Sequence, residues 1–478
     1  MNKPLDYKDL KFMCGIEIHQ QLNGRKLFCN CPTIIKKAQP DFTFSRRLRA
    51  SAGESGKVDL AAAFEMQKSK EFEYSAFNDC TCLVEFDEEP PHPVNPDALI
   101  SAIVAAKLLN MRVADKVQFM RKTVVDGSNV SGFQRTALIG YDGFIEINGK
   151  KIGIESLCLE EEAAQTIERG NSKDSYNISR LGIPLLEIAT APDISSPDEC
   201  KEVAAHLGMI LRSIPNCMRG IGSIRQDVNV SIKKGSRVEI KGFQDIRRMP
   251  QVIIKEIERH LSLINSGKKV QSEVRKVEED DSTSFMRPMP GADRMYPETD
   301  IETILTSDIS VVLPETLDLK IKRYQDLYGL SGDLAQRVVK VESKSDLDFE
   351  SLFKKYSSKN LSQTNIADIL LSQVPSVEKK LGKTLSDADL KKILVALSKG
   401  SVAYSSVPDL IQDALSGKLD TSKYELLSDA EIKKIIKKIL SENKGAPMGL
   451  LMGKVMLALK GRADGRKVKE FLDFELKN

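Results

Sequence analysis

The stretch Gly15-Ile16-Glu17-Ile18-His19 alternates apolar with ionisable residues. This alternation has the period of a half-buried β-strand, whose successive side chains point to opposite faces of a sheet. Ile16 and Ile18 then face a core. Glu17 and His19 lie side by side on the other face, where a carboxylate and an imidazole can share one metal ion or one proton. The stretch therefore predicts a strand that carries two candidate metal ligands.

The front of the chain, up to residue 303, is rich in alternating segments of this kind. Asn148-Gly149 separates two of them and is a strong signal for a tight antiparallel hairpin. Helices are expected after Asn95-Pro96 and Ser196-Pro197, where a capping residue precedes proline, and from Pro250. Strands interrupted by helices indicate an α+β domain built on an antiparallel or mixed sheet. The predicted strand segments are residues 13–22, 117–125, 144–147, 151–159, 223–232 and 238–242.

The back of the chain, after Pro314, has the pattern of short helices. Ser386 and Ser428 each begin a stretch that resembles a capping box, followed by an apolar residue, two lysines and an isoleucine. This local repeat suggests a small bundle of similar helices. Six basic residues near the C-terminus can form a surface that contacts RNA phosphates, although an ordinary solvated helix face has the same pattern. They are Lys454, Lys460, Arg462, Arg466, Lys467 and Lys469.

The composition is that of an ordinary soluble globular protein. The 478 residues are 41% hydrophobic and 29% charged, and their net charge of +3 does not by itself indicate nucleic-acid binding. This length suits two or three domains. The first residues lack an apolar signal core and no apolar run is long enough to span a bilayer, so we expect a cytoplasmic protein with no membrane partner. The lack of a glycine-rich loop ending in Gly-Lys-Ser/Thr argues against a P-loop nucleotide site.

Several carboxylates lie in strand-like segments beside basic residues. Counting by twos places Glu161 at the end of a buried strand, and Glu187 interrupts an otherwise apolar run. Asp227 shares the polar face of its strand with Arg225, and Lys241 follows on the next strand. Acids that hold Mg²⁺, with cations that neutralise developing charge, suit metal-assisted handling of phosphates. The alternative is a set of salt bridges on a solvated sheet face.

Four cysteines form two Cys-x-Cys pairs, Cys29 with Cys31 and Cys80 with Cys82. In the reducing cytosol they are expected as thiols or metal ligands rather than disulfides. Two such pairs can supply four thiolates to one tetrahedral Zn²⁺. The alternative is that they are buried free thiols, which pack as small hydrophobic side chains.

Five motifs together resemble the family of B and E subunits of tRNA-dependent amidotransferases, which convert Glu-tRNA(Gln) to Gln-tRNA(Gln). They fall in the family's order over nearly the whole chain and are specific as a set. Two loops, at residues 125–136 and 290–300, are more similar to the archaeal E subunit than to the bacterial or organellar B subunit. The five motifs are residues 15–19, 26–32, 159–162, 184–188 and 225–229.

The resemblance implies an architecture and a reaction. We expect a cradle-shaped catalytic domain related to glutamine-synthetase-like folds at residues 1–303, a helical domain at 304–383, and a helical tRNA-binding tail at 384–478. In the family's reaction, ATP phosphorylates the side chain of the tRNA-bound glutamate, and ammonia then displaces phosphate. The ammonia is expected from a D-type, asparaginase-like partner subunit in a hetero-oligomer.

The resemblance also implies site residues. Beside the residues that the resemblance supplies, Arg225 and Lys241 of the neighbouring strands are expected on chemical grounds to support the phosphoryl oxygens of ATP. The metal is expected to be Mg²⁺ or, because histidine is a less usual Mg²⁺ ligand, Mn²⁺. The residues carried over as its ligands and as the catalytic set are Glu17, His19, Glu161, Glu187 and Asp227.

One departure from the family concerns an additional domain. The E subunit typically carries a domain similar to one of bacterial aspartyl-tRNA synthetases, inserted before the loop that begins at Met286, and residues 272–285 are too short to contain it. Two rival interpretations remain at this stage. In the first, the chain is a B-type subunit served by a glutaminase partner. In the second, it is a non-catalytic RNA-binding protein whose acids are structural.

Overall fold

The computed structural model describes residues 5–50, 56, 58, 60–291, 295–342, 347–443, 445–459, 462–463 and 465–477. Lys460 of the basic cluster and residues 292–294 of the loop at 290–300 lie outside the described residues. The chain divides into two units, Met1–Thr316 and Leu317–Asn478. Among the described residues, the helices are all too short or too polar to cross a membrane.

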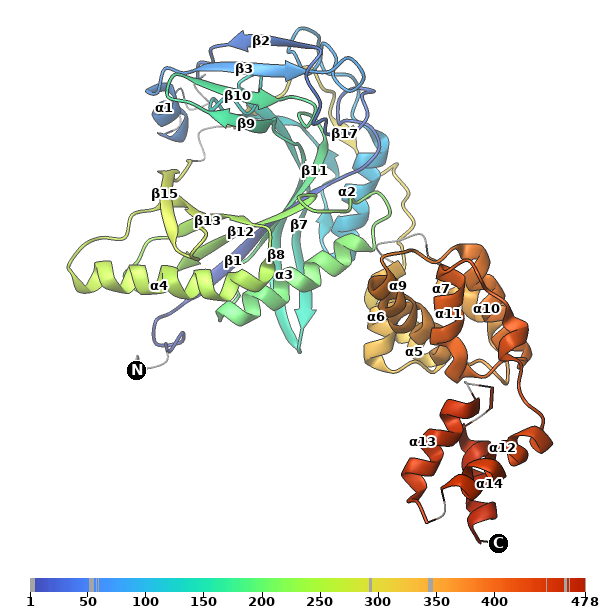
Figure 1. Ribbon diagram of the computed structural model, residues 1–478. Helices are drawn as coiled ribbons and strands as arrows, with labels where there is room; N and C mark the ends of the chain where they lie inside the picture. The colour runs from blue at the N-terminus through green and yellow to red at the C-terminus, as the bar shows by residue number, and fades with distance from the viewer. Residues whose placement is uncertain are drawn as a thin grey trace. The chain divides into compact units, whose positions relative to one another are not determined.

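The first unit is built on an 11-stranded sheet with β1 (Met13–Gln21) near its centre (Figure 1). Strand β1 pairs antiparallel with β11 (Pro184–Thr190) on one side and with β12 (Ile224–Ser231) on the other. Beyond β12 lie β13 (Val238–Phe243), β14 (Glu273–Val277) and β15 (Thr283–Pro288). Beyond β11 lie β8 (Lys150–Glu161), β7 (Phe133–Ile147), β6 (Met120–Thr123) and β16 (Met295–Pro297), with β4 (Arg112–Val113) beside β7. Strands β13 and β14 run parallel, so the predicted α+β class with a mixed sheet is confirmed.

The other strands of the first unit described here form two smaller sheets. One has the order β2 (Phe42–Arg46), β3 (Glu71–Ala76), β10 (Lys173–Asn177) and β9 (Gln165–Arg169), and the other pairs β17 (Ile304–Leu305) with β5 (Lys116–Val117). In Figure 1 the four-stranded sheet lies across from β12 and β13, on the opposite side of the large sheet from helices α3 (Pro197–Arg212) and α4 (Met249–Asn265).

Helices α2 (Pro96–Leu108), α3 and α4 of the first unit begin at or next to the predicted prolines, whereas α1 (Leu60–Met66) was not predicted. The side chain of Asn95 accepts hydrogen bonds from the first backbone amides of α2, and Ser196 caps α3 in the same way. Helix α1 is shorter. Ile16 and Ile18 lie in the main core, together with buried side chains of α3 and α4. The predicted division of β1 into an apolar face and a polar face is therefore confirmed.

The predicted hairpin at Asn148-Gly149 joins β7 to β8. Both residues have positive φ, 52° and 77°, as the tight turn that suits the twist of paired strands requires. The turn fixes the register of β7 and β8 beside it, where Ile147 lies opposite Lys150.

The second unit is helical and has two buried cores. The first gathers side chains of α5 (Leu317–Tyr328), α6 (Gly332–Glu342), α7 (Phe349–Tyr356), α8 (Gln363–Asp368), α9 (Val374–Leu381), α10 (Asp387–Lys399) and α11 (Val407–Leu415). The second gathers those of α12 (Asp429–Glu442), α13 (Met448–Leu459) and α14 (Gly465–Lys477). Short 3₁₀ or π turns of this unit occupy Ile369–Gln373, Tyr404–Ser406 and Thr421–Tyr424, and one of the first unit, Ile246–Arg248, directly precedes α4. The domain boundaries at residues 303 and 383 remain predictions.

Candidate active site

The register of three neighbouring strands brings four of the predicted residues together. His19 of β1 lies opposite Glu187 of β11, and Glu17 lies opposite Asp227 of β12. Directly opposed residues point to the same face of a sheet, so these four side chains share the face that the apolar core does not occupy. His19 and Glu187 are in contact, with 3.2 Å between Nε2 and Oε2.

A cavity of about 350 Å³ lies over this face. Its lining combines acids, cations and polar residues from the loop after β6, so an anionic ligand and a metal ion would both meet suitable groups there. The charged residues that line it are Glu17, His19, Lys122, Asp126, Glu160, Glu162, Glu187, Arg225, Arg237, Glu239, Lys241 and Arg287.

One half of the site is a cluster of three carboxylates. Oxygen atoms of Glu17, Asp227 and Glu239 lie within 4.8 Å of one another. The ammonium of Lys241 lies between two of them, donating to Oδ2 of Asp227 at 2.7 Å and pairing with Glu239. Asn229 donates to Oε1 of Glu17 at 3.0 Å. Oxygen ligands of this kind are those that Mg²⁺ prefers.

The pKa values of this cluster follow from burial and crowding. Burial, and then repulsion from Glu239, raise the pKa of Glu17. Burial also acts to raise the pKa of Asp227, but Lys241 and His19 outweigh it and hold that pKa below its usual value. Burial lowers the pKa of Lys241 less than its carboxylate neighbours raise it. The three carboxylates repel one another, so a cation beside them stabilises the cluster.

The other half of the site pairs His19 and Glu187 with Lys122 of β6 and Glu160 of β8. Nζ of Lys122 lies 2.6 Å from Oε1 of Glu160 and 3.7 Å from Oε2 of Glu187. Burial acts to raise the pKa of Glu187, but Lys122 and His19 outweigh it and place that pKa well below its usual value. Burial and the nearby Glu187 raise the pKa of Glu160. The pKa values of Glu160 and Glu187 are thus displaced in opposite directions.

Glu161 does not join these residues. Its carboxylate faces the other side of β8, where Oε2 accepts a hydrogen bond from the backbone N–H of Arg135 at 3.2 Å and lies 3.4 Å from its Nη1. Its neighbours Glu160 and Glu162 line the cavity instead. Alternation along the end of β8 explains this, because Glu161 has the parity of the buried residues. Sequence reasoning therefore missed Glu160 and Glu162, which the same count by twos could have found.

Arg225 is held at the cavity by Glu162. Its Nη1 and Nη2 donate to the two carboxylate oxygens at 2.8 and 3.0 Å, the bidentate geometry that arginine favours with a carboxylate. Gln21 donates to the same carboxylate at 2.9 Å. These contacts outweigh the effect of burial and lower the pKa of Glu162. The guanidinium is thus fixed in orientation beside the polar face of β1.

The structure brings three of the four paired cysteines together. Sulfur atoms of Cys29, Cys31 and Cys82 and an oxygen of Glu85 lie within 4.8 Å of one another. Cys80 is not in this group. The predicted set of four thiolates is therefore corrected to three thiols and one carboxylate, a donor set that zinc accepts.

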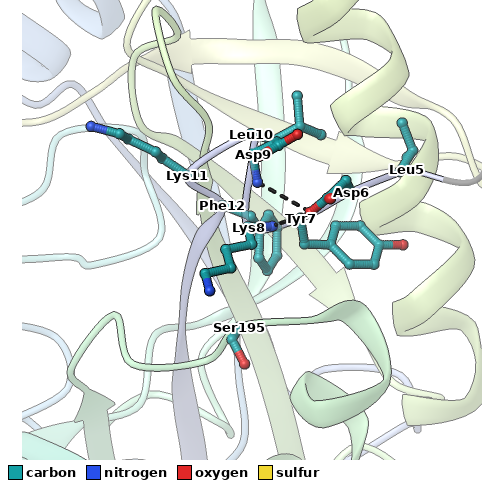
Figure 2. Close-up of a pocket in the computed structure, with 9 residues that line it drawn as sticks. All are labelled: Leu5, Asp6, Tyr7, Lys8, Asp9, Leu10, Lys11, Phe12 and Ser195. Carbon is teal, nitrogen blue, oxygen red and sulfur yellow. Dashed lines mark hydrogen bonds between the residues drawn. The ribbon is translucent and has the colours of Figure 1, made fainter.

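A larger cavity, about 1070 Å³, lies at the N-terminal segment (Figure 2). It is lined by Leu5 to Phe12 and by Ser195. The carboxylate of Asp6 accepts hydrogen bonds from the backbone amides of Lys8 and Asp9, at 3.0 and 3.1 Å, so it closes a local turn. Among the described residues that line this cavity, no group of acids converges like that beside β1, and we do not assign the reaction to it.

Comparisons with known proteins match both units of the chain. A family model of the GatB/GatE catalytic domain matches residues 12–311, and one described as the GatB domain matches residues 347–476. Among curated proteins, the E subunit of glutamyl-tRNA(Gln) amidotransferase from Methanococcus maripaludis is 34% identical over 628 aligned positions that cover 99% of each chain. The proteins of that name from Methanocaldococcus jannaschii and Archaeoglobus fulgidus are 34% and 33% identical, with 99% of each chain covered.

The alignments are longer than the chain. The one with Methanococcus maripaludis spans 628 positions, whereas the chain has 478 residues, so the relatives contain segments that have no counterpart here. The residues on both sides of such segments align nonetheless, since nearly all of each chain is covered. From the two matched domains and from these relatives, the chain belongs to the GatB/GatE family.

Proposed function

We propose that the protein is the E-type subunit of a Glu-tRNA(Gln) amidotransferase, an ATP-dependent ligase. It phosphorylates the glutamate side chain of misacylated Glu-tRNA(Gln) and then amidates it with ammonia to give Gln-tRNA(Gln). The main support is the convergence of the acids and cations from β1, β11, β12 and β13 at one cavity, in a chain whose relatives are named for this activity. Their names favour an E-type over a B-type subunit.

The same cavity argues against a purely structural role for the acids. A solvated salt-bridge network does not need carboxylates gathered within 4.8 Å and largely buried, since burying like charges together is costly. A cation that binds to these carboxylates would offset the cost of burying them together. The rival of a non-catalytic RNA-binding protein has no use for this arrangement.

The proposed metal is Mg²⁺, with Mn²⁺ as the alternative. Glu17, Asp227 and Glu239 would hold it through carboxylate oxygens, and His19 with Glu187 offers further donors nearby. When bound, the ion supplies charge neutralisation for the phosphates of ATP. Glu161 is left out of this ligand set, because its carboxylate is turned toward Arg135.

The cationic residues of the cavity would assist the transfer of the phosphoryl group. A carboxylate is a poor acyl donor because its oxygen is a poor leaving group, and phosphorylation by ATP provides a better one. Lys122, Arg225 and Lys241 line the cavity and would stabilise the negative charge of the transferring phosphoryl group. Arg225 needs little reorganisation for this task, since Glu162 already fixes its guanidinium plane.

The surroundings of this reaction are proposed from the family. The first unit would be a cradle related to glutamine-synthetase-like folds, and the helical tail would contact tRNA through its basic residues. A D-type, asparaginase-like partner would supply ammonia within a hetero-oligomer in the cytoplasm. Cys29, Cys31 and Cys82, with Glu85 as the fourth donor, would hold a structural Zn²⁺.

The catalytic assignment is tested with Glu187→Ala and Asp227→Ala. Both variants should lose tRNA-dependent ATP hydrolysis and formation of Gln-tRNA(Gln), while retaining tRNA affinity in a gel-shift assay. Glu258→Ala, an exposed carboxylate of α4, is the matched control and should behave as wild type. Unchanged turnover in both Glu187→Ala and Asp227→Ala would refute the assignment.

The partner assignment needs a separate experiment. The chain is reconstituted with a D-type subunit and supplied with asparagine, or with an amidase-type subunit and supplied with glutamine. Formation of Gln-tRNA(Gln) in the first mixture supports the E-type proposal. Activity confined to the second mixture would identify a B-type subunit instead.

A further inference from the structure

Lys241 occupies the position in the carboxylate cluster that a cation would be expected to take. Its Nζ lies 2.7 Å from Oδ2 of Asp227 and also pairs with Glu239, two of the three carboxylates that converge there. Lys241 and Glu239 are two residues apart on β13, so both side chains point to the same face. The ammonium and a divalent cation therefore have the same oxygen atoms as ligands.

The ammonium of Lys241 and a divalent cation repel each other, which disfavours binding of both to the same oxygen atoms. A lysine ammonium has no lone pair with which to coordinate a metal, and it repels any cation placed beside it. A divalent ion carries twice the charge of the ammonium and can satisfy several carboxylates at once. Occupancy of the cluster is therefore a competition between the side chain and the ion.

The side chain of Lys241 has room to extend into the cavity instead. The side chain is 27% exposed and lines the cavity together with Arg225, Arg237 and Arg287. Lysine carries its charge on a flexible four-carbon chain with three rotatable donors, so its ammonium can leave one partner for another without movement of β13. A phosphate in the cavity would provide the new partner.

We propose that Lys241 is an exchangeable counter-ion, an inference that rests on the proposed function. In the metal-free protein its ammonium neutralises the cluster of Glu17, Asp227 and Glu239. When a divalent cation binds, the side chain turns from these carboxylates into the cavity, where it contacts the phosphates of the substrate. Lys241 would thus reach its working position only when the metal site is filled.

The most direct test follows the reactivity of Lys241 in the wild-type chain. The protein is acetylated briefly with an N-hydroxysuccinimide ester at increasing Mn²⁺ concentrations, and acetylation of each lysine is measured by mass spectrometry. Acetylation of Lys241 should rise severalfold, with the same midpoint as Mn²⁺ binding measured by electron paramagnetic resonance. Lys276, its register partner on β14, is paired with Glu278 away from the cluster and should not change.

A variant provides the second readout. Lys241→Met has no ammonium to displace, so it should bind Mn²⁺ about tenfold more tightly or better than wild type, although it loses turnover. Lys276→Met, the matched control, should retain wild-type affinity. Since the variant could fail to fold without its counter-ion, its thermal unfolding is first compared with that of wild type.

The outcomes separate this inference from the proposed function. Mn²⁺ that binds while acetylation of Lys241 stays constant or falls would show that the lysine is a fixed salt bridge, and would overturn the exchange alone. Weaker Mn²⁺ binding by a folded Lys241→Met variant would do the same. If wild type binds neither Mn²⁺ nor Mg²⁺, the metal site of the proposed function fails first.

Discussion

Glu256 provides a quantitative prediction about the part of the sheet that carries Lys241. This residue of α4 is 1% exposed, and its carboxylate connects the helix to β15, at the edge of the sheet, and to the adjacent β14. It accepts hydrogen bonds from Arg259 and from the hydroxyl of Thr283, each at 2.6 Å, and lies 3.0 Å from Nε2 of His260 and 3.7 Å from Arg275. Burial acts to raise the pKa of Glu256, but these partners outweigh it and lower that pKa to about 2.

The pKa gives both a magnitude and a pH range. A carboxyl group whose pKa is 4.5 in the unfolded chain and about 2 in the folded chain favours folding by about 3 kcal/mol at neutral pH. Because the folded-state pKa is the lower one, this contribution is complete above about pH 5. It is lost progressively as the pH falls from 4.5 toward 2.

The perturbation is Glu256→Gln, with Glu258→Gln as an exposed control on the same helix. The chain has two units and need not unfold in one step, so stability is measured locally, by hydrogen exchange of β14 and β15 in urea. At pH 7 the Glu256 variant should lose about 2–3 kcal/mol, whereas the control should lose less than about 0.5 kcal/mol. The difference between variant and wild type should shrink by about 1 kcal/mol on going to pH 3.5. A loss at pH 7 no larger than that of the control, or a difference that does not change with pH, would refute the reasoning.

Three further predictions concern the two candidate sites. Arg225→Lys should reduce tRNA-dependent ATP hydrolysis about tenfold or more with little change in tRNA affinity, because one ammonium cannot make both bonds to Glu162. Glu160→Gln should reduce the rate of ATP hydrolysis in the same assay more than Glu161→Gln does, since the first carboxylate lines the cavity and the second does not. Cys82→Ser should lower the zinc content of purified, reduced protein from about one ion per chain to a small fraction, by elemental analysis, whereas Cys80→Ser should not.

The sequence predicted those features that depend on local pattern. Alternation in β1 predicted the buried face of Ile16 and Ile18 and the polar face of Glu17 and His19, and the dipeptide at Asn148 predicted the hairpin. These features follow from the chain's own period and turn chemistry, which need no knowledge of distant segments.

Features that depend on register or on chain reversal were not predicted. Alternation along β13 puts Glu239 on one face with Lys241, but Glu239 reaches the carboxylate cluster because it lies opposite Asn229 of β12, a register that no local pattern specifies. Glu85 reaches the thiols because the chain turns after Cys82, and a single carboxylate has no distinguishing signal among 68 acidic residues. For Glu161, the family motif suggested a metal ligand. Counting by twos along the strand, by contrast, correctly placed its side chain on the buried face.

The dependence of the site on register explains why β1 lies at its centre. A shift of one residue in its pairing with β11 or β12 would carry Glu17 and His19 to the apolar side and expose Ile16 and Ile18 to solvent. The apolar residues of the strand therefore do more than stabilise the core, because the free energy of burying them also excludes the one-residue shifts that would separate Glu17 from Asp227 and His19 from Glu187. Strand packing and site geometry are thus two consequences of the same alternation, and a variant that loosens the core beneath β1 should weaken metal binding before it unfolds the unit.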